Sequence, residues 1–180
     1  MMRGLLSFGI CGSALVLAAA VAGAVELPTR KAGLWEMKIV KTGSKLPDIS
    51  MQHCTDPTSD KDMTNSVSPI AKQMCTKQDL AKTATGYVSD SVCTVAGVGM
   101  TTHAEIVGDF NSAYTVTSTS HLDKGPSGTP VDTVTTIEAK WLGDCKPDQK
   151  PGDIMMPGGF KLNVKDAEKF KNLVPAPKAN

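Results

Sequence analysis

The number and spacing of four cysteines are the most informative chemical feature of this chain. Cys54, Cys75, Cys93 and Cys145 follow an export leader, and an even number of cysteines in an exported chain predicts two disulfides. Of the three connectivities open to them, we favour Cys54–Cys75 with Cys93–Cys145, on the basis of loop length. A metal or redox site would need close pairs such as Cys-Xaa-Xaa-Cys, and no two of these cysteines lie that close together.

Two histidines and two methionines are the candidates for a metal site. His103 and His121 fall on the two arms of a predicted hairpin and, with a third ligand, could hold zinc or copper. Their spacing fixes neither register nor face, so we interpret them as ordinary histidines of a sheet. The pair Met155-Met156 offers soft thioether ligands of the kind that suit Cu(I), but methionines also fill cores and make apolar contacts. We therefore assign the chain no metal and no cofactor.

Nucleophilic catalysis has no sequence pattern to support it. The chain contains no Gly-Xaa-Ser-Xaa-Gly elbow, no Gly-rich phosphate loop and no His-Glu-Xaa-Xaa-His run. Cysteines held in disulfides would not supply a thiolate nucleophile. We name no catalytic residue and expect a protein that is not an enzyme.

An apolar pocket is the binding site that the sequence favours. Residues 34–40 alternate between apolar and polar side chains, which places Trp35, Met37 and Ile39 on one face of a strand. A second strand over residues 131–142 adds Ile137 and Trp141 on one face. Together these five side chains could surround a small apolar ligand, or the two tryptophans could serve as anchors of the core.

Residues 1–24 have the order of a secretory signal peptide. Arg3 makes the start weakly positive, an apolar run rich in Ala, Leu and Val follows over residues 5–21, and Ala22-Gly23-Ala24 supplies the small residues that a signal peptidase reads. Cleavage at that point would leave a mature chain that begins at Val25. The alternative is an uncleaved anchor, which we favour less because glycines dilute the apolar run.

The charge balance excludes a strongly basic binding surface. Arg3 is the single charged residue before Val25, so the mature chain keeps 18 of the 19 basic residues against 18 acidic residues. A formal net charge of zero gives no electrostatic attraction for nucleic acid or for anionic lipid. We expect neither partner, and no stable membrane span after cleavage.

Period-two alternation and runs rich in Thr, Val, Ile and Tyr predict a mainly β domain over residues 25–145. The clearest hairpin is expected where the polar link Asp109-Phe110-Asn111-Ser112 joins two such runs. Successive hairpins predict an antiparallel meander that forms a small curled sheet, a barrel or a sandwich. The predicted strands cover residues 34–40, 49–54, 87–95, 100–108, 113–122 and 131–142.

Helical signals are modest and fall in two places. Residues 66–75 predict a short helix with Pro69 in its first turn. Residues 164–173 predict a second short helix, because apolar side chains recur on one side. Residues 146–159 are rich in Pro and Gly and predict an irregular connector. Residues 146–180 would thus pack on the β domain or trail from it.

Several distinct short motifs are distributed along most of the mature chain. The motifs are Lys31-Ala32-Gly33-Leu34-Trp35-Glu36, Gln52-His53-Cys54, Cys75, Cys93, Gly108-Asp109-Phe110 and Ala139-Lys140-Trp141-Leu142-Gly143-Asp144-Cys145. With them, residues 32–159 resemble a widespread family of small exported proteobacterial proteins known as a domain of unknown function. Its pattern starts with Gly-Leu-Trp-Glu and closes with Leu-Gly-Xaa-Cys. The resemblance implies a periplasmic setting, and it brings no activity, ligand or catalytic residue.

These observations favour a binding or accessory function in the periplasm. The first hypothesis is a non-enzymatic module that holds a small apolar ligand. The alternative is a protein-interaction or envelope-stability factor that contacts an envelope protein through residues 146–174. Both remain open at the level of sequence, because a fold class alone licenses no function.

Overall fold

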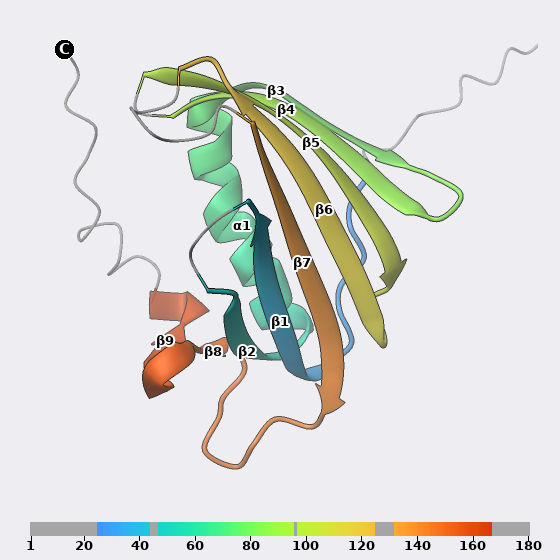
Figure 1. The fold of residues 1–180 in the computed structure, drawn as a ribbon. Coiled ribbons are helices and arrows are strands. Elements are labelled where there is room, and N and C mark those ends of the chain that lie inside the picture. Colours follow the sequence, from blue (N-terminus) through green and yellow to red (C-terminus); the bar gives the residue numbers. More distant parts are fainter. Residues whose placement is uncertain (1–24, 44–46, 96, 125–131, 167–180) are drawn as a thin grey trace, which may run out of the picture.

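The computed structural model describes residues 25–43, 47–95, 97–124 and 132–166, and the proposed leader lies outside these ranges. One nine-stranded sheet dominates the described part, with neighbouring strands antiparallel and in the order β3-β4-β5-β6-β7-β1-β2-β8-β9 (Figure 1). The prediction of a mainly β fold with a curled antiparallel sheet is confirmed. The strands are β1 Gly33–Thr42, β2 Ile49–Thr55, β3 Cys75–Lys82, β4 Gly86–Val95, β5 Val98–Asp109, β6 Ala113–Leu122, β7 Asp132–Gly143, β8 Asp153–Met155 and β9 Lys161–Asn163.

Side-chain alternation divides the sheet into an inner and an outer face. On the inner face, Met37 of β1 lies opposite Ala139 of β7, which in turn lies opposite Tyr114 of β6. On the outer face, Glu36 lies opposite Lys140, and this cross-strand pairing of unlike charges is favourable. The apolar side chains therefore face inward, and the charged ones face solvent.

Helix α1 (Pro57–Met74) spans the hollow of the curled sheet (Figure 1). It follows β2 and precedes β3, which stand far apart in the strand order, yet the helix contacts β2, β3 and β4. The sheet must therefore curve enough to bring both ends of the helix against it. The inner face is thus covered by a helix, as the apolar face of a sheet requires.

The predicted helix over residues 66–75 is too short, and its start is misplaced. Asp56 is the N-cap, and its carboxylate accepts a hydrogen bond from the Ser59 backbone N–H at 2.7 Å, while the Ser59 hydroxyl accepts one from the Asp56 N–H at 2.9 Å. Pro57 then occupies the first turn, where its missing N–H costs nothing. This cap starts the helix nine residues before the predicted position, and Pro69 lies inside it.

Three strands were not predicted because their sequences lack apolar alternation. β3 is an exposed edge strand that contains polar residues and pairs only with β4. β8 and β9 are short strands that continue the sheet beyond β2. Their pairing, not their composition, makes them strands.

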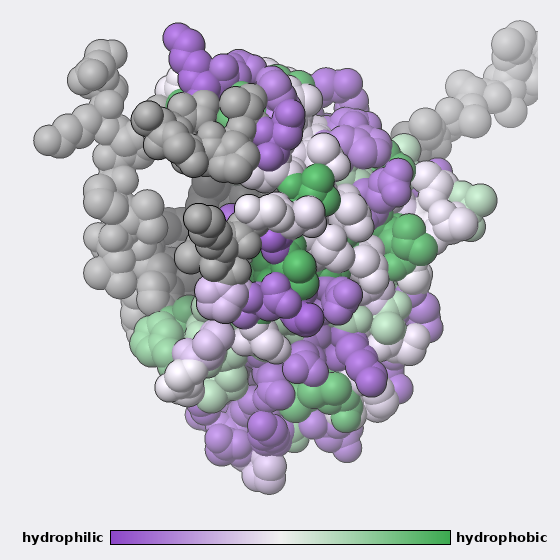
Figure 2. Space-filling model, in the orientation of Figure 1, coloured by the Kyte–Doolittle hydropathy of each residue, from purple (hydrophilic) through white to green (hydrophobic). Residues whose placement is uncertain are grey.

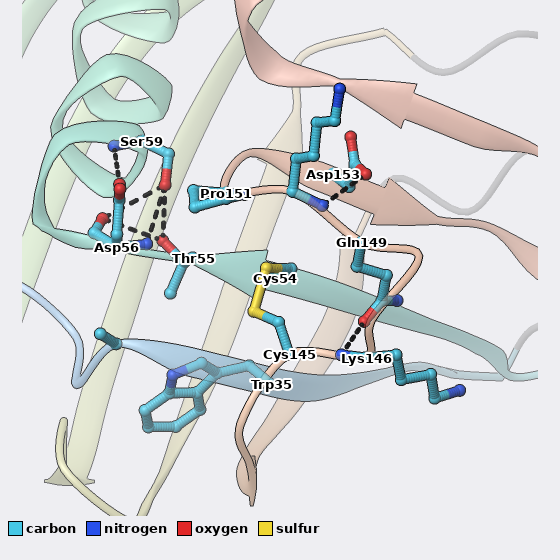
Figure 3. Close-up of a disulfide and its surroundings, with 12 residues drawn as sticks. Trp35, Cys54, Thr55, Asp56, Ser59, Cys145, Lys146, Gln149, Pro151 and Asp153 are labelled. Atoms are coloured by element: carbon cyan, nitrogen blue, oxygen red, sulfur yellow. Dashed lines mark hydrogen bonds between the residues drawn. A yellow bond between two sulfur atoms is a disulfide. The ribbon is translucent and has the colours of Figure 1, made fainter.

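The predicted irregular connector over residues 146–159 is therefore wrong in part. It contains β8 and a 3₁₀ turn, η1 (Pro157–Gly159), and it is tied to the sheet by a hydrogen bond from Gly152 N to the Cys54 carbonyl at 2.8 Å. Within it, Gln149 and Asp153 are buried and bond to the backbone of Lys146 and Lys150 (Figure 3). The predicted second helix begins with a 3₁₀ turn, η2 (Val164–Asp166), and its residues 167–173 lie outside the described residues.

All four predicted cysteines form disulfides, but the preferred pairing is wrong. The bonds are Cys54–Cys145 and Cys75–Cys93. The cause is α1, because an 18-residue helix is about 27 Å long and places Cys54 and Cys75 at its opposite ends. The loop-length argument was also wrong, because Cys75 and Cys93, separated by 18 residues, close a shorter loop than Cys54 and Cys75 would. Figure 3 shows the Cys54–Cys145 bond between β2 and the segment that follows β7.

The apolar core of the described residues centres on β1. Its fully or nearly buried side chains centre on Trp35, whose exposed fraction is zero, with Leu34, Cys54, Cys93, Ile106 and Ala139. In the described residues, no helix is both long and apolar enough to cross a membrane.

Candidate functional site: a groove on the inner face

A groove of about 750 Å³ lies on the inner face of the sheet. One wall is the N-terminal strap, which we define as residues 25–29, and a second wall is the first part of α1. The floor comes from strands β1, β3, β5 and β6, with apolar side chains that include Met37, Leu80, Ile106 and Val116. The strap lies directly before β1 and turns its exposed Val25 and Leu27 to the groove.

The strap is anchored at its end by Arg30. The Arg30 side chain is buried, and its guanidinium pairs with Asp60 of α1, with Nη2 2.6 Å and Nε 2.7 Å from Oδ1. The Arg30 backbone N–H also donates to Oδ2 of Asp60 at 2.9 Å. Both carboxylate oxygens of Asp60 are thus bonded to Arg30, and charge-assisted hydrogen bonds of this kind fix geometry as well as charge. The next residue, Lys31, donates its backbone N–H to the Phe110 carbonyl at 2.8 Å.

The same guanidinium also contacts His53, which is buried on β2. Arg30 Nη2 lies 2.9 Å from Nδ1 of His53, and because an arginine only donates, Nδ1 is the acceptor. The proton of the neutral ring is then on Nε2, which is buried and has no hydrogen-bond partner within the described part of the chain. Burial, with the positive charge of Arg30, lowers the pKa of His53 from 6.5 to about 4.

A row of aromatic rings leads from the core to the groove. Trp35 lies against Tyr114 with ring centroids 5.7 Å apart, and Tyr114 stacks on Phe110 at 4.7 Å. Phe110 in turn meets Tyr87 edge-on at 6.2 Å. Burial raises the pKa of the Tyr114 hydroxyl, so the ring presents an uncharged surface to the groove. Tilted, edge-on and offset-stacked ring contacts at such distances are favourable beyond the area they bury.

The five residues of the predicted apolar pocket share the inner face, but most of them lie outside the groove. Strand register places Trp35 opposite Trp141 and Ile39 opposite Ile137, as the alternation predicted. Of the five, however, only Met37 lines the groove. The predicted set therefore has to be revised: the groove lies further along the sheet, toward β5 and β6.

The contacts of the two tryptophans explain why neither of them lines the groove. Trp35 is completely buried, and its indole N–H donates to the Lys31 carbonyl at 2.8 Å. Trp141 is half-buried under the Lys31 ammonium, which lies 3.5 Å from the ring centroid, a cation–π contact. Both rings thus hold the chain at the entrance to β1. A glycine is required there, because Gly33 has φ of +128° and a Cβ would collide with the Gly143 carbonyl.

The histidines considered as metal ligands lie together on the outer face. Register places His103 and His121 on adjacent strands as diagonal neighbours. Each has its own carboxylate partner: Asp90 Oδ1 is 2.8 Å from His103, and Asp132 Oδ1 is 2.6 Å from His121. Figure 2 shows that this side of the molecule is mainly hydrophilic, with separate hydrophobic spots. Among the described residues, no group of three or more His, Cys, Asp or Glu side chains is arranged to hold a metal ion.

The two residues of the methionine pair have different positions, because β8 ends between them. Met155 belongs to that strand and lies opposite Gln52 and Lys161, whereas Met156 follows the strand and caps η1. Both are half-buried. Their surroundings thus give them structural contacts in the short β8–β9 extension.

The groove residues that sequence reasoning missed are polar or come from unpredicted elements. Arg30 and Asp60 belong to no sequence motif that predicts a binding site, and Leu80 belongs to the unpredicted β3. The Asp56-Pro57 start of α1 was a readable cap signal that would have placed Asp60 in the first turn of a helix. Phe110 lies within the predicted hairpin link and Tyr114 shortly after it, but which face they take depends on register.

The fold and the groove define a class of domain: one open, curled antiparallel sheet, held by two disulfides and covered by a helix, with a groove on its inner face. The chain belongs to the family described as "Protein of unknown function (DUF3617)", whose model matches residues 30–145. No curated protein and no solved structure matched the chain. The family match begins at Arg30, the anchor of the strap, and ends at Cys145.

Proposed function

We propose that this protein is exported to the periplasm, is not an enzyme, and binds a small apolar ligand in the groove. The observation that carries the proposal is the groove itself, with about 750 Å³ of space and a floor of Met, Leu, Ile, Val and aromatic side chains. Sites for small molecules are typically concave, mainly apolar and of this size. Methionines such as Met37 and Met63 adapt their shape to irregular apolar partners.

Two further observations support export. Two disulfides suit an oxidising compartment, and residues 1–24 have the order of a cleavable signal peptide. Cleavage after Ala24 would make the strap the N-terminus of the mature protein. The strap would then be a free chain end that is anchored at Arg30.

The alternative role, protein interaction through residues 146–174, has weaker support. Residues 153–163 contribute β8 and β9 to the sheet, and Gln149 and Asp153 are buried. This segment thus has a structural task that explains its sequence.

The first test is the intact mass of the natively purified periplasmic protein, before and after denaturing extraction. We expect a chain that begins at Val25 and lacks the four hydrogens lost to two disulfides. A further mass that is present natively and disappears on extraction would be the ligand. Free thiols at the four cysteines would contradict the proposed compartment.

The second test measures binding of the uncharged apolar dye Nile red. We expect Leu27→Asp to weaken binding about tenfold, because a carboxylate replaces apolar surface in the groove wall. Val107→Asp is the matched control: Val107 is 47% exposed and Leu27 is 46% exposed, but Val107 lies on the outer face. Equal effects of the two substitutions would argue against the groove as the binding site.

A further inference from the structure

The charges around the groove cancel one another. Acidic and basic side chains are equal in number in its lining: Glu26 and Asp60 are acidic, and Arg30 and Lys61 are basic. Arg30 and Asp60 are the buried pair, with side-chain exposures of 5% and 12%. The part of the groove where a charge would matter most therefore has no net charge.

The donors of Arg30 are already engaged. Nε and Nη2 bond to Asp60, Nη2 also reaches His53, and Nη1 lies 3.7 Å from the Met37 sulfur. A ligand carboxylate that displaced Asp60 or approached Nη1 would lie close to the Asp60 charge in a poorly solvated site. An alkylammonium would meet the Arg30 charge in the same way. Either ion would also lose hydration against apolar walls.

We infer that the groove selects uncharged apolar molecules, and that Asp60 sets this selectivity by neutralising Arg30. This inference rests on the proposed binding function and names its ligand class. Asp60 is here a specificity-determining residue: without its charge, the buried guanidinium would face the groove as an anion site. The ligand class is then a neutral lipid-like molecule, such as a long-chain alcohol, and not a fatty acid.

The test is displacement of Nile red from the mature disulfide-bonded protein at neutral pH by decanol, decanoate and decylamine. These probes share one alkyl chain and differ in charge. We expect decanol to displace the dye at a concentration about tenfold lower than either ion, because each ion would lose hydration against the apolar walls and the buried Arg30–Asp60 pair is already neutral. Decanoate that matches or exceeds decanol would overturn the inference and leave the proposed function intact. Failure of Nile red to bind at all would defeat the proposed function itself.

A substitution tests the role of Asp60 directly. Asp60→Asn keeps the shape of the side chain and uncovers the Arg30 charge, so we expect the affinity for decanoate to rise about tenfold and that for decylamine to fall. Asp62→Asn makes the same change of charge two residues along α1, outside the groove lining, and should leave the ranking unchanged. An unaltered ranking in a folded Asp60→Asn protein would refute the role of Asp60. If that variant does not fold, the ranking of the three probes in the wild-type protein still decides the selectivity.

Discussion

His53 shows how a single residue can make stability depend on pH. Its ring is buried, and Arg30 donates to Nδ1, so a second proton would be placed beside a guanidinium. The charged groups that face it are Arg30 and Asp60, and the unfavourable effects of burial and Arg30 outweigh the favourable effect of Asp60. The folded protein therefore holds His53 neutral.

We predict that the free energy of unfolding falls by on the order of 3 kcal/mol through His53 as pH drops from about 6.5 to about 4. The sign follows because the unfolded chain binds a proton over this window and the folded chain does not. His53→Gln keeps an acceptor for Arg30 and should remove this part of the pH dependence in urea titrations. His121→Gln, at an exposed histidine of the outer face, is the control and should retain it.

His103 should behave in the opposite way. Its hydrogen bond to Asp90, with the nearby charge of Glu105, raises the pKa of the ring above 6.5. The resulting stabilisation is complete below the unfolded pKa and is lost as pH rises through the folded pKa. We expect NMR titration to give His103 a pKa above 6.5, and Asp90→Asn to lower it. A His103 pKa that Asp90→Asn leaves unchanged would contradict the pairing.

At the scale of elements, the reciprocal bonds of Asp56 and Ser59 decide where α1 begins. The backbone N–H of Ser59 holds the pKa of the Asp56 carboxyl below its usual range, so the cap is fully formed at neutral pH and weakens in acid. We expect Asp56→Ala to lower the free energy of unfolding by about 1 kcal/mol. Asp62→Ala, within the same helix, should cost less, and equal costs in denaturant titration would show that the cap is not the cause.

The elements that sequence predicted are those whose side chains face two different environments. Six strands with apolar–polar alternation were found, and residues 100–108 and 113–122 pair as predicted. β3, β8 and β9 were missed, because β3 is an edge strand of mainly polar residues, and β8 and β9, at three residues each, are too short to show a period-two signal. The groove was misplaced for a related reason: alternation shows which side chains share a face, but the position of a hollow depends on curvature and on what covers the sheet.

At the scale of the whole molecule, the disulfides secure both ends of the helix that covers the sheet. Cys54 lies two residues before the N-cap of α1, and Cys75 is its C-cap. Cys54 is bonded to the segment after β7, and Cys75 is bonded to β4, so each end of α1 is fixed to a different part of the sheet. This arrangement holds the first turn of α1, with Asp60, against the strap. It also explains why a pairing of Cys54 with Cys75 is excluded by the helix between them.

The two disulfides should differ in what they contribute to stability. Chain entropy alone gives about 4.5 kcal/mol for the 91-residue separation of Cys54 and Cys145, and about 3 kcal/mol for the 18-residue separation of Cys75 and Cys93. We therefore expect the C54A/C145A protein to unfold at a lower guanidinium concentration than the C75A/C93A protein. Equal midpoints, or the reverse order, would mean that the edge strand β3 and not the β2–β7 connection limits the stability of the sheet.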